Sequence, residues 1–273
     1  MSTLTITIIQ SNLHWQDKAA NLKMFEEKID SIKDKTEIVV LPEMFSTGFV
    51  IQPNGLAETM EGDTLQWMKR VAARKKVILT GSVIIKEPNQ VTAMGGTPVH
   101  YYNRLVWMLP TGEYGYYDKR HRFAFAGEDQ NYTAGNKRLI ASVKGWKVNL
   151  QVCYDLRFPV WSRQAAVENE ELEYDLLIYV ANWPERRNHA WKTLLQARAI
   201  ENQCYVVGLN RVGKDGTDLY HSGDSMVVDP LGEVLYHKKD DEDIFTIKLD
   251  KAHLQSIREK FPFWKDRDQF SIH

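Results

Sequence analysis

The hydrophobic positions in the first third of the chain follow two alternating patterns. Three short runs are apolar and rich in β-branched residues, which is typical of strands. Between them, apolar residues recur every three or four positions, as on one face of a helix. The predicted strands are residues 4–9, 37–41 and 77–80, and the predicted helices are residues 17–34 and a segment that starts at Asp63. This β-α-β-α-β order favours parallel strands joined by crossover helices.

The remainder of the chain predicts a hairpin followed by a second set of strands and helices. Residues 119–136 have weak periodicity and many polar positions, so we expect a long functional loop there. No linker-like or low-complexity stretch divides the chain, which predicts one domain over residues 1–273. The further predicted strands are residues 99–108, 111–116, 147–152, 174–181 and 204–210, the predicted helices begin near Pro159 and cover 188–203, and residues 225–228, 233–237 and 243–247 predict a closing antiparallel group.

The overall composition is that of an ordinary globular protein. Of 273 residues, 43% are hydrophobic and 26% are charged, and the net charge is −1. This balance lacks the basic excess of a nucleic-acid-binding surface, and no apolar segment is long enough to span a bilayer. The N-terminus lacks the basic and apolar regions of a signal peptide, so we expect a cytoplasmic protein with reduced thiols. The eight histidines show no metal-ligand spacing, and we expect no metal.

Cys153 is the most informative residue of the chain. It follows the predicted strand at residues 147–152 and precedes a polar segment that ends at Pro159, so it lies where a strand gives way to a helix. The partial positive charge at a helix start is expected to lower the thiol pKa and to activate Cys153 as a nucleophile. The other cysteine, Cys204, begins an apolar run and is predicted to belong to the core.

Two further reactive side chains occupy equivalent positions. Glu43 follows the strand predicted at residues 37–41, and Lys119 ends the strand predicted up to residue 118. Because the carboxyl ends of strands line the crevice of an α/β sheet, these two residues and Cys153 can converge in one pocket. There the carboxylate can take the thiol proton, while the ammonium and the N–H of Tyr154 can stabilise an oxyanion. This combination predicts acyl transfer.

Three segments around these residues resemble the signature motifs of the nitrilase (carbon–nitrogen hydrolase) superfamily. They are Leu-Pro-Glu-Met-Phe at 41–45, Tyr-Asp-Lys-Arg-His at 117–121 and Val-Cys-Tyr-Asp-Leu-Arg-Phe-Pro at 152–159, in the order of the family and at similar spacing. The form of the second motif and the closing segment at 261–266 resemble the ω-amidase branch. The flanking segments that also fit the family are residues 182–184, 197–202, 222–225 and 229–232.

The resemblance implies an α/β fold, a four-layer α-β-β-α sandwich with mixed sheets, commonly assembled as a homodimer. It implies a catalytic triad of Glu43, Lys119 and Cys153 with no metal or organic cofactor. It also implies a second, supporting carboxylate after the lysine, which falls on Glu128. Residue 122 is an arginine where many relatives have a large apolar residue, and we expect Arg122 to alter the mouth of the pocket without touching the triad.

The resemblance further predicts an amidohydrolase that cleaves the primary amide C–N bond of a small ω-monoamide acid, such as 2-oxoglutaramate or succinamate. The reaction would proceed through a thioester on Cys153 and release ammonia. The free carboxylate of such a substrate requires a cation, and the sequence offers Arg157, Arg186 and Arg187 without choosing among them. The predicted substrate-binding residues are Tyr154, Trp183 and Arg157.

Three alternatives stay open at this point. The same Glu-Lys-Cys chemistry would serve a nitrilase that acts on R–C≡N, or an amidase for N-carbamoyl or aliphatic amides. A papain-like hydrolase would need a histidine as base, and His121, two residues past Lys119, is the candidate. The chain could also be a catalytically silent binding protein, although three intact reactive positions argue against that.

Overall fold

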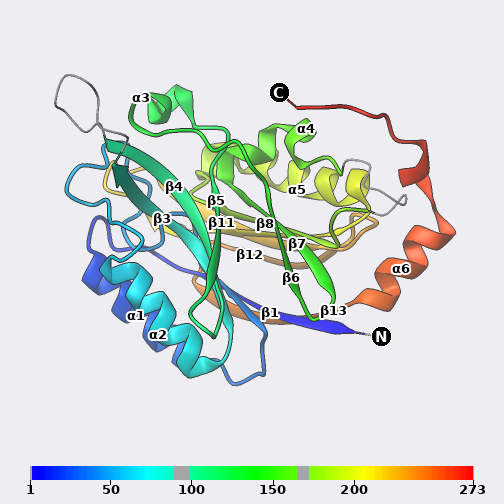
Figure 1. Ribbon diagram of the computed structural model, residues 1–273, viewed down its shortest axis with the longest axis horizontal. Helices are drawn as coiled ribbons and strands as arrows, with labels where there is room; N and C mark the ends of the chain where they lie inside the picture. The colour runs from blue at the N-terminus through cyan, green and yellow to red at the C-terminus, as the bar shows by residue number, and fades with distance from the viewer. Residues whose placement is uncertain (1, 89–98, 165–171, 273) are drawn as a thin grey trace.

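Two β-sheets are stacked face to face between two layers of helices in the computed structural model, which describes residues 2–88, 99–164 and 172–272 (Figure 1). The first sheet contains β1 (Thr3–Gln10), β2 (Ile38–Val40), β3 (Ile78–Pro88), β4 (Val99–Met108), β5 (Tyr114–Asp118) and β13 (Asp243–Asp250). Their order is β13-β1-β2-β3-β4-β5. β1, β2 and β3 are parallel, as the predicted crossover series requires, and the outer pairs are antiparallel.

The second sheet repeats this arrangement of parallel centre and antiparallel edges. It contains β6 (Leu139–Val143), β7 (Trp146–Val152), β8 (Leu176–Ala181), β9 (Tyr205–Asn210), β10 (Val212–Lys214), β11 (Tyr220–Val228) and β12 (Val234–Lys239). The order is β10-β11-β9-β8-β7-β6, and β12 pairs with β11. β7, β8 and β9 are parallel, which aligns their carboxyl ends at one edge.

The helices form the two outer layers. α1 (Lys18–Ser31) and α2 (Asp63–Lys75) pack on the first sheet, and α4 (Pro159–Ser162) and α5 (Asn188–Asn202) cover the second (Figure 1). α1 begins where predicted because the Asp17 side chain accepts a hydrogen bond from an N–H of its first turn. The four-layer α-β-β-α sandwich with mixed sheets predicted from the sequence is confirmed.

The main hydrophobic core lies between the two sheets. The inward faces of β1, β2 and β4 meet those of β7, β8 and β9, and the contributing side chains are buried. Burial of each leucine or isoleucine contributes about 1.5–3 kcal/mol relative to an exposed side chain. A core shared by both sheets supports the prediction of one domain. Representative members are Ile6, Ile8 and Leu105 from the first sheet and Val148, Leu150 and Ile178 from the second.

The prediction of one closing antiparallel group is wrong for the last strand. β12 pairs with β11, but β13 crosses to the first sheet and pairs with β1 along its full length. The register runs from Thr3 opposite Asp250 to Gln10 opposite Asp243. A local hydrophobic pattern identifies a strand, but it carries no information about a partner at the other end of the chain.

Several short elements differ from the sequence prediction. β6, β10 and α6 (Lys251–Lys260) are additional, and the helix predicted from Pro159 is only the four-residue α4, because a single turn has no periodicity to read. The expected loop at residues 119–136 includes η1 (Ala124–Ala126) and α3 (Glu128–Asn131). None of the helices in the described part of the chain combines the length and apolar character that a membrane span requires.

Candidate active site

The carboxyl ends of strands from both sheets meet at one point. Glu43 follows β2, Lys119 directly follows β5, and Cys153 directly follows β7 as the first residue of η2 (Cys153–Arg157). The structure brings these three predicted residues together. The Lys119 Nζ atom is 3.0 Å from Glu43 Oε1, and the charges of Glu43 and Lys119 both act on the pKa of the Cys153 thiol.

Lys119 lies between two carboxylates in a closed polar cluster. Its Nζ atom is 3.0 Å from Glu43 Oε1 and 2.9 Å from Glu128 Oε2, and none of the three side chains is more than 1% exposed. Burial alone would lower the pKa of Lys119, but the negative charges of Glu128 and Glu43 outweigh it and raise that pKa. The lysine is therefore an ammonium. Burial raises the pKa of Glu128, and the charge of Lys119 opposes that rise.

The segment that carries Glu128 depends on Gly127 and Arg122. Gly127 joins η1 to α3 with a φ of 82°, a left-handed conformation that glycine adopts without steric cost. Arg122 Nη1 donates hydrogen bonds to the main-chain carbonyls of Asp129 at 3.3 Å and Tyr132 at 2.9 Å. Arg122 thus stabilises this segment and does not line the cavity described below, which corrects the expectation that it alters the cavity mouth.

The thiol of Cys153 has a raised pKa, so the expectation of a lowered pKa is wrong. Burial raises the pKa well above its ordinary value, the negative charge of Glu43 raises it further, and the charge of Lys119 opposes both. The partial positive charge at the start of the short η2 turn is too weak to offset the rise in the thiol pKa that burial beside a carboxylate causes. Cys153 is therefore a thiol at neutral pH, in contact with a carboxylate that can accept its proton.

Sequence reasoning missed two asparagines that bind Glu43. Asn103 Nδ2 donates to Glu43 Oε1 over 2.8 Å, and the Asn182 N–H donates to Glu43 Oε2 over 2.8 Å. The Asn182 side chain also donates to the main-chain carbonyl of Glu43. Asn182 follows β8, so the strand-end rule could have identified it. Asn103 lies inside β4, where no sequence signal distinguishes it from other strand residues.

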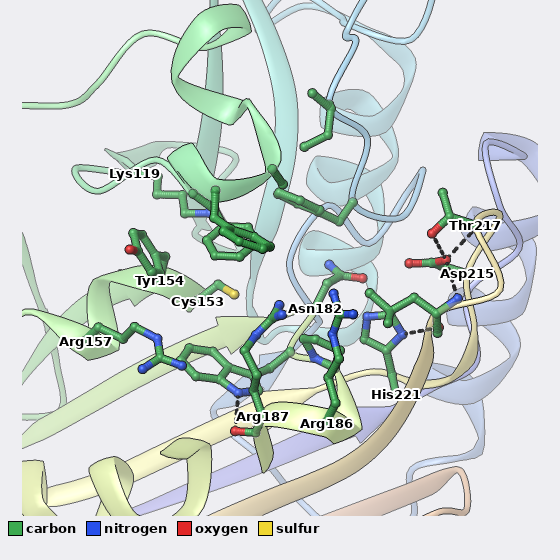
Figure 2. A pocket seen from close by; sticks show the side chains of 18 of the residues that line it. Lys119, Cys153, Tyr154, Arg157, Asn182, Arg186, Arg187, Asp215, Thr217 and His221 are labelled. Atoms are coloured by element: carbon green, nitrogen blue, oxygen red, sulfur yellow. Dashed lines mark hydrogen bonds between the residues drawn. The ribbon is translucent and has the colours of Figure 1, made fainter. Parts of the chain in front are cut away.

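A cavity of about 240 Å³ opens beside Cys153 and Lys119 (Figure 2). All three predicted substrate-binding residues and all three candidate arginines line it. Its other end, away from Cys153 in Figure 2, is lined by residues of the β10–β11 connection that sequence reasoning missed. The predicted lining residues are Tyr154, Arg157, Trp183, Arg186 and Arg187, and the missed ones include Trp15, Phe49, Phe123, Asp215, Thr217 and His221.

Three arginines give one wall of this cavity an excess of positive charge. Arg186 and Arg187 belong to η4 (Glu185–Arg187), and the Arg157 guanidinium lies 4.8 Å from the ring centroid of Trp183. No ion pair joins any of the three to a carboxylate within the part of the chain that the structure describes. Burial, and then the neighbouring charge of Arg186, lower the pKa of Arg187. An anionic ligand would relieve this repulsion.

His121 does not stand beside the thiol, as a papain-like mechanism would require. Its Nδ1 atom is 2.8 Å from Asp155 Oδ1, and its ring stacks on Phe158 with centroids 3.8 Å apart. It is absent from the walls of the cavity into which Cys153 opens. Among the described residues, no group of three or more His, Cys, Asp or Glu side chains is arranged to hold a metal ion.

Comparison with known proteins assigns the chain to a family. The model of the carbon-nitrogen hydrolase family matches residues 5–259. The chain belongs to the carbon-nitrogen hydrolase family. The resemblance stated from three motifs is confirmed, and so is the predicted enzyme class, a carbon–nitrogen hydrolase that acts on amides.

The alignments with similar proteins cover all or nearly all of this carbon–nitrogen hydrolase. It is 41% identical over 275 residues to omega-amidase YafV of Yersinia enterocolitica, with 100% of both chains covered. It is 30% identical over 265 residues to the 2-oxoglutaramate amidase of Bacillus subtilis, with 96% of both covered. A crystal structure of a CN-hydrolase superfamily protein from Xanthomonas campestris, which carries an arsenic adduct in its active site, matches with a TM-score of 0.92, 41% identity and 100% of both chains covered.

Proposed function

We propose that this enzyme cleaves the primary amide of a small ω-monoamide acid, of the 2-oxoglutaramate or succinamate type, and releases ammonia. One observation carries the proposal: a thiol, a carboxylate and an ammonium lie at one end of a cavity whose wall bears three arginines. An ω-amidase at 41% identity and a 2-oxoglutaramate amidase at 30% identity support the same substrate class.

In the first half of the proposed reaction, Glu43 takes the proton of Cys153 as the sulfur attacks the amide carbon. The raised thiol pKa favours this coupled transfer over a resting thiolate. The new C–S bond turns the carbonyl oxygen into an oxyanion, which the Lys119 ammonium and the Tyr154 N–H stabilise. Loss of one such donor typically costs ~10²–10³ in rate. Glu43 then protonates the amide nitrogen, the C–N bond breaks, and ammonia leaves.

In the second half, water hydrolyses the thioester. Glu43 accepts a proton from the water as its oxygen adds to the acyl carbon, and Lys119 stabilises the second oxyanion. The C–S bond breaks, the sulfur regains the proton from Glu43, and the carboxylic acid is released. Glu128 contacts Lys119 through both carboxylate oxygens, at 3.0 and 2.9 Å, and so keeps the ammonium charged and aimed at the reacting oxygen.

We assign the substrate carboxylate to Arg187. Its main-chain carbonyl accepts a hydrogen bond of 2.8 Å from Trp183 Nε1, which fixes the backbone at this position, and its guanidinium lies 5.0 Å from the ring centroid of Phe123, which supports the side chain. Its lowered pKa means that the cation gains stability when an anion binds beside it. The cavity, at about 240 Å³, is smaller than the roughly 300–1,000 Å³ of most ligand pockets.

Ammonia release from a panel of amides tests this proposal. We expect 2-oxoglutaramate and succinamate to be hydrolysed much faster than butyramide, which lacks the carboxylate, or a simple nitrile. Glutamine should be poorer than 2-oxoglutaramate, because its α-ammonium would face three arginines. A faster reaction with the nitrile or with butyramide would refute the substrate assignment.

Two cysteine variants test the chemistry. Cys153→Ala should abolish ammonia release, whereas Cys204→Ala, at a fully buried position away from the cavity, serves as the matched control and should retain it. Folded Cys153→Ala protein that releases ammonia at the unmodified rate would exclude a thioester mechanism.

The homodimer stays a prediction, and we retain it as part of the proposal. Exposed apolar side chains on α5 and in the β11–β12 turn support it, because Ile200 is 54% and Leu231 is 47% exposed. Light scattering of the purified protein measures its mass in solution directly. The cytoplasmic location is likewise a prediction that rests on the sequence alone.

A further inference from the structure

Asp155 is a buried carboxylate that the proposed mechanism does not use. It is the third residue of η2, two positions after Cys153, and it is 0% exposed. A buried carboxylate is costly unless hydrogen bonds satisfy it, and the ion-pair partner found for Asp155 among the described residues is His121, with no lysine or arginine.

Four hydrogen-bond donors converge on the two oxygens of Asp155. Oδ2 accepts from the Val152 N–H at 3.0 Å and from the Tyr117 hydroxyl at 2.8 Å. Oδ1 accepts from the His121 N–H at 2.9 Å and from His121 Nδ1 at 2.8 Å. Because a carboxylate only accepts, Nδ1 carries the proton in this arrangement.

These donors flank two of the proposed catalytic residues. Val152 ends β7 and immediately precedes Cys153, on the second sheet. Tyr117 lies in β5 of the first sheet, two positions before Lys119, and His121 lies two positions after Lys119 in the segment that follows β5. Asp155 therefore connects the turn that begins at Cys153, after the second sheet, to the segment around Lys119, after the first. The hydrogen bonds leave the two segments little freedom to move relative to each other.

The hydroxyl of Tyr117 extends the same connection. It accepts hydrogen bonds from the Arg120 N–H at 3.1 Å and from Trp161 Nε1 at 2.9 Å, while it donates to Asp155. The main chain on the C-terminal side of Lys119 is thus fixed at two consecutive N–H groups, those of Arg120 and His121. Trp161, from α4, joins the layer of helices to the same network.

The backbone of Cys153 supplies an independent reason for such a connection. Its φ is +44°, in the left-handed region, where a residue other than glycine is strained by about 1–3 kcal/mol. Strain of this kind persists only where surrounding contacts determine the conformation. The hydrogen bond from the Val152 N–H to Asp155 closes the turn on the very residue that is strained.

We infer that Asp155 is a positioning residue that holds the Cys153 turn and the Lys119 segment at one fixed separation. It touches neither substrate nor reacting atoms, and it acts through the main chain on both sides. The expected effect of Asp155 on kcat rests on the proposed amide hydrolysis. Its expected effect on the position and ionisation of the Cys153 thiol does not.

Asp155→Asn tests the inference, with Asp229→Asn as the matched control. The substituted amide keeps the size of the side chain, but its NH₂ group faces donors and leaves them without an acceptor. Asp229 is also a buried aspartate that accepts two main-chain N–H bonds, from Leu231 and Glu233, but in the β11–β12 turn away from the cavity. Thermal unfolding of both variants provides a measure of general destabilisation.

Two readouts separate positioning from general destabilisation. With an accepted ω-monoamide, Asp155→Asn should lower kcat about 100-fold with KM changed by less than about threefold, because a misplacement of about 1 Å has that cost. Without any substrate, the pH midpoint for alkylation of Cys153 by iodoacetamide, read by peptide mass spectrometry, should fall toward about 8.5, the ordinary value for a cysteine. Asp229→Asn should leave both unchanged.

The inference would be overturned if kcat fell equally in the two aspartate variants, or if kcat in Asp155→Asn equalled that of the unmodified enzyme. If Asp155→Asn does not fold, Tyr117→Phe removes one of the four donors and should lower kcat about tenfold, with a smaller fall in the alkylation midpoint. A Tyr117→Phe protein with both values unmodified would also overturn it. Alkylation needs no substrate, so an enzyme that accepts none of the tested amides would refute the proposed function and still leave this test readable.

Discussion

The buried cluster around Lys119 and the arginine wall of the cavity differ in how their charges are paired. Lys119 has two carboxylates within 3.0 Å, and none of these three side chains is more than 1% exposed. The wall has three partly accessible guanidinium groups without carboxylate partners among the described residues, and aromatic rings support two of them. The cluster is complete before substrate arrives, whereas the wall gains a carboxylate partner only when an anionic ligand binds.

Because of this difference, the cluster and the wall should govern different kinetic constants. A preorganised cluster stabilises charge that develops during the reaction, so its loss should appear in kcat. A wall with unpaired charge binds a group that is present both before and during the reaction, so its loss should appear in KM. Substitutions in the cluster and in the wall test this division directly.

Glu43→Gln should lower kcat by ~10³-fold or more, because it removes the base for Cys153 and the acid for ammonia while keeping the side-chain size. KM should change little, since the arginine wall is intact. Steady-state ammonia release at several substrate concentrations measures both constants. A large rise in KM with unchanged kcat would mean that the cluster binds substrate and does not perform proton transfer.

Arg187→Gln should raise KM for an ω-monoamide acid by ~10–100-fold, the value of one lost hydrogen-bonded charge pair of about 1.5–3 kcal/mol. The kcat should stay close to that of the unmodified enzyme. The internal control is butyramide, whose weak hydrolysis should not change, because it has no carboxylate. An equal loss with butyramide would show that Arg187 acts on the reaction and not on the carboxylate.

Alkaline pH should lower the free energy of unfolding of the unmodified protein more steeply than that of Cys153→Ala. Burial keeps the folded thiol protonated, whereas the thiol of the unfolded chain ionises near pH ~8.5. The contribution of Cys153 is therefore fully present below that pH and falls by about 1.4 kcal/mol per pH unit above it, until the folded pKa is reached.

Urea unfolding of the two proteins between about pH 8 and pH 10 measures this difference in slope. Cys204 also has a pKa raised by burial, but it is present in both proteins and cancels. Equal slopes would mean that the Cys153 thiol ionises as readily in the folded state as in the unfolded chain, which would contradict a thiol pKa raised by burial.

Arg186→Gln should have the smallest effect, a rise in KM of about threefold or less, because an exposed charge interacts weakly with a ligand through water. This rise in KM should become smaller still when the ionic strength is raised. A KM effect as large as that of Arg187→Gln would move the carboxylate site from the half-buried arginine to the exposed one.

The strand ends could be predicted from sequence because each depends on a local pattern. Apolar runs located the strands before Glu43, Lys119 and Cys153, and the rule that such ends share one edge brought the three residues together. The partner of β13 could not be predicted, because strand pairing depends on the whole sheet. Asn103 could not be predicted as a site residue for a related reason, since only the folded β4 turns its side chain toward Glu43.

The charge state of Cys153 could not be predicted either. Its position at the start of a turn suggested a lowered pKa, but burial and the neighbouring Glu43 depend on residues distant in sequence. Asp155 is the opposite case, because it stood inside a recognised motif and had no assigned purpose until its four donors were located. Sequence proximity gave its location, and only the three-dimensional contacts gave its partners.

The pairing of β13 with β1 has a consequence for synthesis on the ribosome. β1 ends at Gln10, whereas the strand that covers its outer edge begins only at Asp243 and therefore emerges much later. Until then the nascent chain exposes an unpaired strand edge, a surface that invites association with other chains. We therefore expect truncation before Asp243 to yield aggregates even though Glu43, Lys119 and Cys153 are all present.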